Sequence, residues 1–305
     1  MPALPEQPAV RTSFLGDGAS RLYVRELGRG LPIVVLHGGP DFDHEYLLPD
    51  LDRLAGRFHL VYYDQRGRGR SFSGQPPDSV TIATEMEDVD RVRDWTGHAS
   101  TALLGHSWGG LLALEYAIRH PDRVSHLILV NTAPASHASM LVLRHKLVAS
   151  RSPQQAARMA ELLADPGYRA GDIEADAEYY RIHFGSALRR PDQLDHVIRQ
   201  LRVGFTSEGI VAARLIEDDL YAQTWSVADY DLIPELRRLR IPTLVIHGER
   251  DLVPVDVARQ IASAISGSHL IVLNDCGHFA YLEQPDRVVS AITELMAPRQ
   301  KPVRP

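Results

Sequence analysis

Three short and wholly apolar runs restrict the folds open to this chain of 305 residues. They lie at residues 33–36, 127–130 and 244–246 and contain only valine, leucine and isoleucine. A strand exposed on one face alternates apolar and polar residues, whereas a parallel strand covered by helices on both faces is apolar throughout. The runs therefore predict a parallel sheet buried between two layers of helices.

Strand-like and helix-like segments alternate along most of the chain. Strands are predicted at residues 21–27, 33–37, 60–63, 102–104, 125–131, 243–247 and 270–273. Helices are predicted at residues 45–55, 80–96, 108–120, 255–265 and 285–296. This alternation is typical of a wound α/β sheet.

The alternation stops between residues 134 and 234, where no buried strand is predicted. Amphipathic helical segments follow one another there, for example at 141–149, 154–163, 175–184 and 193–201, with proline and glycine between them. We interpret residues 1–133 and 235–305 as one α/β core and residues 134–234 as a helical cap inserted into it. The cap is expected over the carboxyl edge of the sheet, where open α/β sheets bind ligands.

The composition argues against several classes of function. A formal net charge of −6 disfavours binding to nucleic acid or a membrane surface, since both need a basic face. The single cysteine, Cys276, allows no intramolecular disulfide and no cysteine-based zinc site, and no other ligand cluster implies a metal or cofactor. We recognise no signal peptide and no apolar run that could span a bilayer. We expect a cytoplasmic enzyme without a cofactor that acts on a small molecule or short peptide; its oligomeric state stays open.

A serine flanked by glycines is the sharpest chemical signal in the sequence. The motif Gly105-His106-Ser107-Trp108-Gly109 follows one predicted strand and opens the next predicted helix. Strand, tight turn and helix form the context of a nucleophile elbow, where a strained backbone projects the hydroxyl and side chains two residues away would collide. Ser107 is therefore predicted to be a nucleophile; a chance match in a loop is the alternative.

A serine hydroxyl needs a base, and His278 has the position expected of one. It lies after the last predicted strand, in the chain order serine, acid, histidine. Asp251 is favoured as the acid because it lies in the loop after the strand at 243–247. Asp256 fits better as a first-turn carboxylate of the next helix, and Asp275 is too near His278 in sequence.

The backbone N–H groups of Gly39 and Trp108 are predicted to form an oxyanion hole. Trp108 follows the nucleophile, and Gly39 lies in the motif His37-Gly38-Gly39-Pro40 at the end of an early strand. Proline cannot donate, and a glycine lets the substrate oxygen approach closely. A simple glycine-proline turn is the alternative for this motif.

A basic, glycine-rich run, DQRGRGRS at residues 64–71, could hold a phosphate group. It lacks the lysine and hydroxyl residue of a P-loop. A tight loop held by hydrogen bonds of Asp64 and Arg66 is the favoured interpretation. Cys276 is interpreted as a small packed residue and not as a second nucleophile.

Taken together, these motifs resemble the proline iminopeptidase branch of the α/β-hydrolases. They are HGGP at 37–40, DQRGRGRS at 64–71, GHSWGG at 105–110, GERD at 248–251 and GH at 277–278, and residues 178–184 are similar to a cap helix of that branch. The resemblance implies the α/β-hydrolase fold, with a mostly parallel eight-stranded sheet, helices on both faces and a helical cap. It also implies a serine hydrolase that releases an N-terminal residue, usually proline, from short peptides.

The sequence departs from the pattern of that branch at three places. Asp41 and His106 stand where the branch usually has glycine. Family aminopeptidases bind the substrate's amino group with cap carboxylates, one of them in an Asn-Glu-Phe-like stretch that this sequence lacks. Trp225 occupies about that place and Glu178 matches a cap helix loosely, so both are candidate substrate-binding residues. The acidic residues slightly upstream of Trp225 are Glu217, Asp218 and Asp219.

Two hydrolytic activities fit these residues, a proline-iminopeptidase-like exopeptidase and a small carboxylesterase. The esterase is considered because a cavity without a counter-ion for the amine suits a neutral acyl group. Epoxide and haloalkane hydrolysis are disfavoured because their nucleophile is a carboxylate and residue 107 is serine. A protein that captures a small ligand without catalysis is the alternative from another class.

Overall fold

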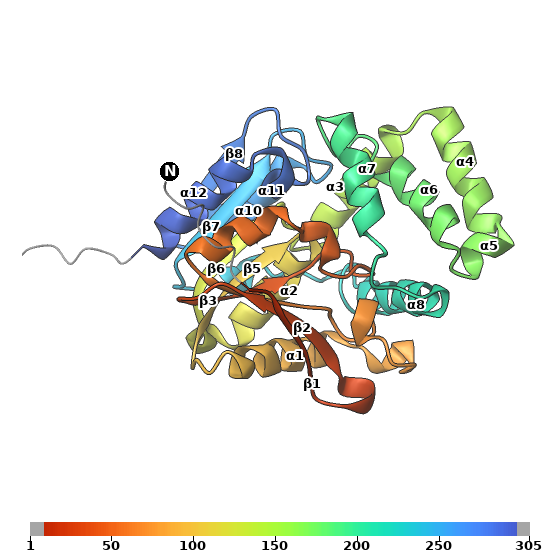
Figure 1. Ribbon diagram of the computed structural model, residues 1–305. Coiled ribbons are helices and arrows are strands. Elements are labelled where there is room, and N and C mark those ends of the chain that lie inside the picture. The colour runs from red at the N-terminus through yellow and green to blue at the C-terminus, as the bar shows by residue number, and fades with distance from the viewer. Residues whose placement is uncertain (1–8, 298–305) are drawn as a thin grey trace, which may run out of the picture.

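A single twisted sheet organises the molecule (Figure 1). The computed structural model describes residues 9–297, and the eight strands in this range pair in the order β1-β2-β4-β3-β5-β6-β7-β8. The β1–β2 and β2–β4 pairs are antiparallel and all the other pairs are parallel. The predicted mostly parallel sheet of eight strands is thus confirmed. The strands are β1 Arg11–Leu15, β2 Leu22–Leu27, β3 Pro32–Leu36, β4 His59–Tyr63, β5 Thr101–His106, β6 Val124–Val130, β7 Thr243–Gly248 and β8 His269–Leu273.

Two of the differences from the sequence-based prediction have a clear physical reason. The edge strand β1 was not predicted, because its largely exposed residues carry no buried apolar run. The helix predicted at residues 45–55 is instead two 3-10 helices, η2 (Glu45–Leu47) and η3 (Asp50–Gly56), with Pro49 between them. Proline inside a helix removes a hydrogen bond and clashes with the preceding turn, so one continuous helix cannot form there.

Helices cover both faces of the sheet and bury its centre. Every residue of β3 and β5 is buried, as the apolar runs predict. The helices α1, α2, α9 and α10 contact one another in a chain along one face, and α11 and α12 pack with η3 on the other. These helices are α1 Ile82–Trp95, α2 Trp108–Arg119, α9 Ile233–Leu236, α10 Val255–Ala264, α11 Ala280–Glu283 and α12 Pro285–Met296.

A run of helices follows β6 and lies to one side of the sheet (Figure 1). Ser136 and Asp231 form an isolated antiparallel bridge, so the chain leaves the core and returns to it at the same place. Within residues 9–297, no helix is long and apolar enough to cross a membrane. The helices of this segment are α3 His137–Ala149, α4 Pro153–Ala164, α5 Pro166–Arg169, α6 Ile173–His183, α7 Pro191–Gln200 and α8 Ser207–Gln223.

Close packing of α2 on β3 requires glycine at residue 109. A Cβ on Gly109 would lie 2.0 Å from the carbonyl oxygen of Leu36, a backbone atom that cannot move aside. We expect Gly109→Ala to lower the free energy of unfolding by about 3 kcal/mol, measured by urea denaturation. Gly56→Ala is the matched control, since a Cβ there meets nothing within 4 Å. Equal urea midpoints for the two variants would contradict this account of the packing.

Candidate active site

Ser107 occupies the turn between β5 and α2 in the strained conformation that the motif predicts. Its backbone angles are φ 53° and ψ −119°, a left-handed φ that is costly for a residue with a side chain. A Cβ on Gly105 would lie 2.3 Å from the carbonyl oxygen of Gly109, so side chains at the flanking positions would collide. The serine is thereby held at the carboxyl end of β5, at the first turn of α2.

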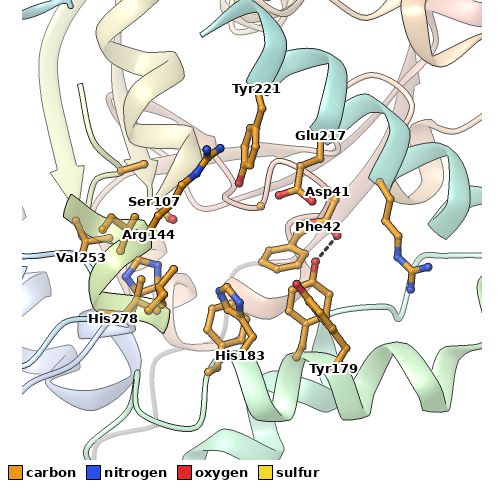
Figure 2. Close-up of a pocket in the computed structure, with 18 of the residues that line it drawn as sticks. Asp41, Phe42, Ser107, Arg144, Tyr179, His183, Glu217, Tyr221, Val253 and His278 are labelled. Atoms are coloured by element: carbon orange, nitrogen blue, oxygen red, sulfur yellow. Dashed lines mark hydrogen bonds between the residues drawn. The ribbon is translucent and has the colours of Figure 1, made fainter. Parts of the chain in front are cut away.

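His278 and Asp251 meet at the carboxyl ends of the neighbouring strands. Asp251 follows β7 and His278 follows β8, and His278 Nδ1 lies 2.8 Å from Asp251 Oδ1. Both side chains are buried. The Ser107 hydroxyl makes no hydrogen bond to the residues described, but it lines the same cavity as His278 (Figure 2). Catalytic hydrogen bonds are often long until substrate binds.

Hydrogen bonds and neighbouring charges keep Asp251 ionised. Asn131 Nδ2 donates to Asp251 Oδ2 at 2.7 Å, and the backbone N–H of Val253 donates to Oδ1 at 2.8 Å. Burial alone would raise the pKa of Asp251, but His278, His247 and the hydrogen bonds outweigh it and lower the pKa to about 2. At neutral pH the carboxylate can therefore hold the imidazole of His278 by its Nδ1.

The loop after β3 lies against the serine turn. A Cβ on Gly38 would come within 3.1 Å of Ser107 Cβ, and the N–H of Gly38 donates to the hydroxyl of Tyr46 at 2.7 Å. Gly39 has a φ of 118° and lines the cavity. The N–H of Trp108 opens α2 and therefore has no acceptor within the helix. Gly39 and Trp108 therefore both lie near Ser107, and their role as oxyanion donors stays a prediction.

His106 has a role that the sequence did not indicate. Its Nε2 lies 2.9 Å from the carbonyl oxygen of His278, and its Nδ1 lies 2.8 Å from the hydroxyl of Tyr46. Burial and the nearby His278 lower the pKa of His106 to about 3, so the ring is neutral. A neutral imidazole donates from one nitrogen and accepts at the other. His106 therefore ties the loop of His278 to Tyr46 and acts as a positioning residue.

Ser107 and His278 open into a cavity of about 460 Å³ between the sheet and the helices that follow β6 (Figure 2). This size is within the range of small-molecule sites. Most of the lining is aromatic or aliphatic. Five charged side chains also line the cavity: Asp41, Arg144, Arg214, Glu217 and Asp218.

Asp41 anchors a buried network of charges on the side of the cavity across from Ser107. Its Oδ2 accepts a hydrogen bond from Tyr180 Oη at 2.6 Å (Figure 2). Arg202 Nη2 donates to the same oxygen, also at 2.6 Å. Arg202 also bonds Asp176, which in turn pairs with Arg214. The other oxygen of Asp41, Oδ1, is buried and has no partner among the described groups. The sequence marked Asp41 only as a departure from the family pattern.

Glu217 faces Asp41 from α8 (Figure 2). Burial and the charge of Asp41 raise the pKa of Glu217 to about 8, although a hydrogen bond from Tyr221 and the charge of Arg202 oppose this rise. The two acidic groups come from the loop after β3 and from a helix that is distant in sequence. Only the folded chain brings them into one cavity.

The two proposed cap residues have different positions. Trp225 lines the cavity, packs edge-on against Trp108 at 5.5 Å between ring centroids, and donates from Nε1 to the carbonyl oxygen of Pro134. Glu178 does not line it. Its carboxylate accepts two hydrogen bonds of 2.7 Å from Arg158 at the protein surface. The adjacent Tyr179 faces the cavity from α6, so helical geometry directs Glu178 outward.

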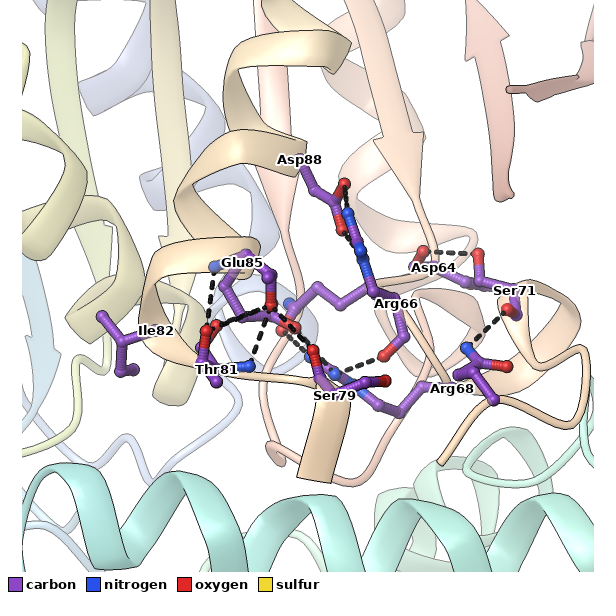
Figure 3. A network of polar contacts seen from close by, with 12 residues as sticks. Asp64, Arg66, Arg68, Ser71, Ser79, Thr81, Ile82, Glu85 and Asp88 are labelled. Carbon is purple, nitrogen blue, oxygen red and sulfur yellow. Dashed lines mark hydrogen bonds and ion pairs between the residues drawn. The ribbon is translucent and has the colours of Figure 1, made fainter. Parts of the chain in front are cut away.

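The basic loop at residues 64–71 is a structural element (Figure 3). Arg66 binds Asp88 through two hydrogen bonds of 2.8 and 2.6 Å, and Arg68 pairs with Glu85 at 2.8 Å. Ser71 Oγ donates to the carbonyl oxygen of Asp64 at 2.6 Å. Arg70 pairs with Glu45 at 2.7 Å. Carboxylates therefore pair with all three guanidinium groups of the loop, as the interpretation of a pinned loop predicts, and none is available for a phosphate.

Comparison with known proteins assigns the class. The sequence profile of the family described as alpha/beta hydrolase fold matches residues 32–285. Because this match covers most of the chain, the chain belongs to the α/β hydrolase family and is a hydrolase. The predicted fold class is confirmed.

Within that class, proline iminopeptidases are similar over nearly the whole chain. The proline iminopeptidase of Saccharolobus solfataricus is 28% identical over 283 residues, which cover 90% of this chain and 87% of that protein. The Lactobacillus crispatus proline iminopeptidase is 29% identical over 292 residues, covering 88% and 92%. The predicted resemblance to this branch is thus confirmed.

Solved structures agree on the fold. The crystal structure of a Mycobacterium smegmatis proline iminopeptidase matches with a TM-score of 0.69 at 24% identity, over 94% of this chain and 97% of that one. An alpha/beta fold family hydrolase from Bacillus anthracis matches with a TM-score of 0.75 at 19% identity, over 94% and 99%. At these identities the likeness establishes the fold and leaves the substrate open.

Proposed function

We propose that this chain is a serine hydrolase that works through an acyl-enzyme and releases an N-terminal residue, such as proline, from small peptides or amides. One observation carries the proposal: the cavity that holds Ser107 and His278 is also lined by acidic groups, among them Asp41 and Glu217, which face each other. A substrate with a free amino group needs a negative partner when it leaves water. The names of the similar proteins support the same activity.

The chemistry follows from the positions of the side chains. Ser107 Oγ attacks the substrate carbonyl while His278 accepts its proton, and the N–H groups of Gly39 and Trp108 stabilise the oxyanion. His278 then gives the proton to the leaving amine, the C–N bond breaks, and an ester to Ser107 remains. A water molecule, deprotonated by His278, hydrolyses this ester and frees the acid and the serine. Asp251 keeps the imidazole oriented throughout.

A carboxylesterase is the second candidate, and the burial of Glu217 beside Asp41, which raises its pKa, favours it. With a pKa of about 8, Glu217 is mostly uncharged in the empty cavity at neutral pH. An uncharged wall suits a neutral acyl group. The two candidates differ in whether a free amino group on the substrate accelerates the reaction.

Glu217→Gln separates the two activities. We expect the variant to lower kcat/KM for prolyl anilide by about 10- to 100-fold, because the amide can still accept a hydrogen bond from the ammonium but carries no charge to attract it. The ratio of prolyl anilide to short acyl ester turnover should fall accordingly. Asp219→Asn, on the same helix but outside the cavity, is the control and should keep the wild-type ratio. Turnover of esters alone by the wild type would establish the esterase.

The pH dependence provides a second readout of the same variant. Below pH 8 Glu217 is protonated and attracts an ammonium group weakly, and above it the carboxylate is ionised. The substrate's own amine loses its proton near pH ~8. We therefore expect kcat/KM for the anilide to rise from pH 6 to a maximum near ~8 and then fall. In Glu217→Gln the rise should be shallower, and an unchanged profile would exclude Glu217 as the group that titrates.

A further inference from the structure

The charges in the cavity are separated in space. Asp41 and Glu217 lie on one side, and Arg144 extends from α3 on the side of Ser107 and Val253 (Figure 2). An N-terminal amine held by the acidic pair would place the following carbonyl toward Ser107. The leaving group then points to the side on which Arg144 lies.

Arg144 is the cavity-lining cation that the described residues leave unpaired. The other lining arginine, Arg214, pairs with Asp176 and donates to the carbonyl oxygen of Tyr168 at 2.6 Å. Arg144 has no ion pair or hydrogen bond to any residue in 9–297, and its side chain is exposed at the cavity. A guanidinium group with all its donors unused is suited to a carboxylate, which it can bind through two parallel hydrogen bonds.

A second cation of α3, Lys146, lies outside the cavity lining. Lys146 donates a hydrogen bond from Nζ to the backbone carbonyl oxygen of Asp251 at 2.5 Å. Its ammonium therefore lies beside the loop that carries the acid of the triad. Ser107 thus faces negative groups across the cavity, and Arg144 is the cation from α3 that lines the cavity with it.

We propose that Arg144 binds the α-carboxylate of the leaving group, so that the preferred substrates are dipeptides with a free amino and a free carboxyl end. This inference rests on the proposed aminopeptidase activity. A dipeptide carries its carboxylate one residue beyond the scissile carbonyl, a reach of about 3.6 Å per extended residue. Each further residue moves the carboxylate past Arg144, so longer peptides lose this contact.

The test compares prolylalanine with prolylalanine amide, which share the amino end and the scissile bond and differ only in the terminal charge. We expect kcat/KM to be about tenfold higher for the free acid in the wild type, a modest factor because Arg144 is exposed to solvent. Arg144→Met should bring the ratio of acid to amide close to 1, and Arg144→Lys should give an intermediate ratio. Raising the salt concentration from 50 to 500 mM should also lower the wild-type ratio, since salt screens exposed charges.

Arg237→Met is the matched control, because it removes an exposed guanidinium outside the cavity and should keep the wild-type ratio. A wild-type ratio near 1, or a ratio that survives Arg144→Met, would overturn the role of Arg144 while prolyl turnover upholds the aminopeptidase. Failure to hydrolyse any prolyl substrate, with esters still cleaved, would overturn the aminopeptidase and this inference together. The two failures are therefore distinguishable in one set of assays.

Discussion

Replacing Ser107 with alanine is expected to lower kcat by about 10⁴- to 10⁶-fold and to abolish covalent labelling by a fluorophosphonate probe. The reason is that no other group in the elbow can form the acyl-enzyme, so the residual rate comes only from substrate binding and the oxyanion donors. Steady-state kinetics and intact-protein mass give the two readouts. The melting temperature should change little, because the Ser107 hydroxyl bonds to none of the described residues.

Ser263→Ala is the control, since Ser263 is an exposed serine on α10. It should leave both labelling and turnover at the wild-type level. A folded wild-type protein that takes up no label and turns over no substrate would contradict the proposed mechanism. That outcome would favour a protein that captures a small ligand without catalysis.

Asp251→Asn is expected to lower kcat by about 10⁴-fold, the second largest effect. The carboxylate accepts from His278 Nδ1, Asn131 and the backbone of Val253, so it fixes which nitrogen of His278 carries the proton. An amide cannot accept all three hydrogen bonds and carries no charge to stabilise the imidazolium. Because this charge develops in the transition state, kcat should fall more than KM rises.

Glu249→Gln is the matched control for the acid. Glu249 lies in the same loop but is exposed and weakly bound. Its loss should change kcat by less than about fivefold, because an exposed charge contributes about 1 kcal/mol or less. The low pKa of Asp251 also predicts that no acid limb from this group appears in the pH–rate profile above pH 5, because it stays ionised there. Activity of Asp251→Asn within tenfold of wild type would show that another group orients His278.

Sequence patterns predicted the core well because burial determines the pattern of a central strand directly. β3, β6 and β7 each contain an uninterrupted apolar run, because helices cover both faces of these strands. An edge strand such as β1 faces solvent, so its sequence contains no apolar run that would identify it. The helix predicted at 45–55 failed for a different reason, because local proline chemistry at Pro49 overrode the periodicity.

The candidate triad was recognisable for a similar reason. In a parallel sheet the carboxyl ends of all strands lie along one edge, so residues just after β5, β7 and β8 lie on the same edge of the sheet. The sequence therefore placed Ser107, Asp251 and His278 at the same edge of the sheet. Their catalytic roles stay a prediction until the variants are measured.

The sequence by itself thus determined the sheet, the nucleophile elbow and the loops that carry its partners. Only the tertiary structure decided what surrounds the substrate: it turns Glu178 to the surface, brings Glu217 to Asp41, and leaves Arg144 unpaired on the side of Ser107. The physical reason is that periodicity shows which residues share a face of a helix, but the face that meets the cavity depends on how each helix packs on the core. Such packing joins residues that are distant in the chain, and no local pattern encodes it.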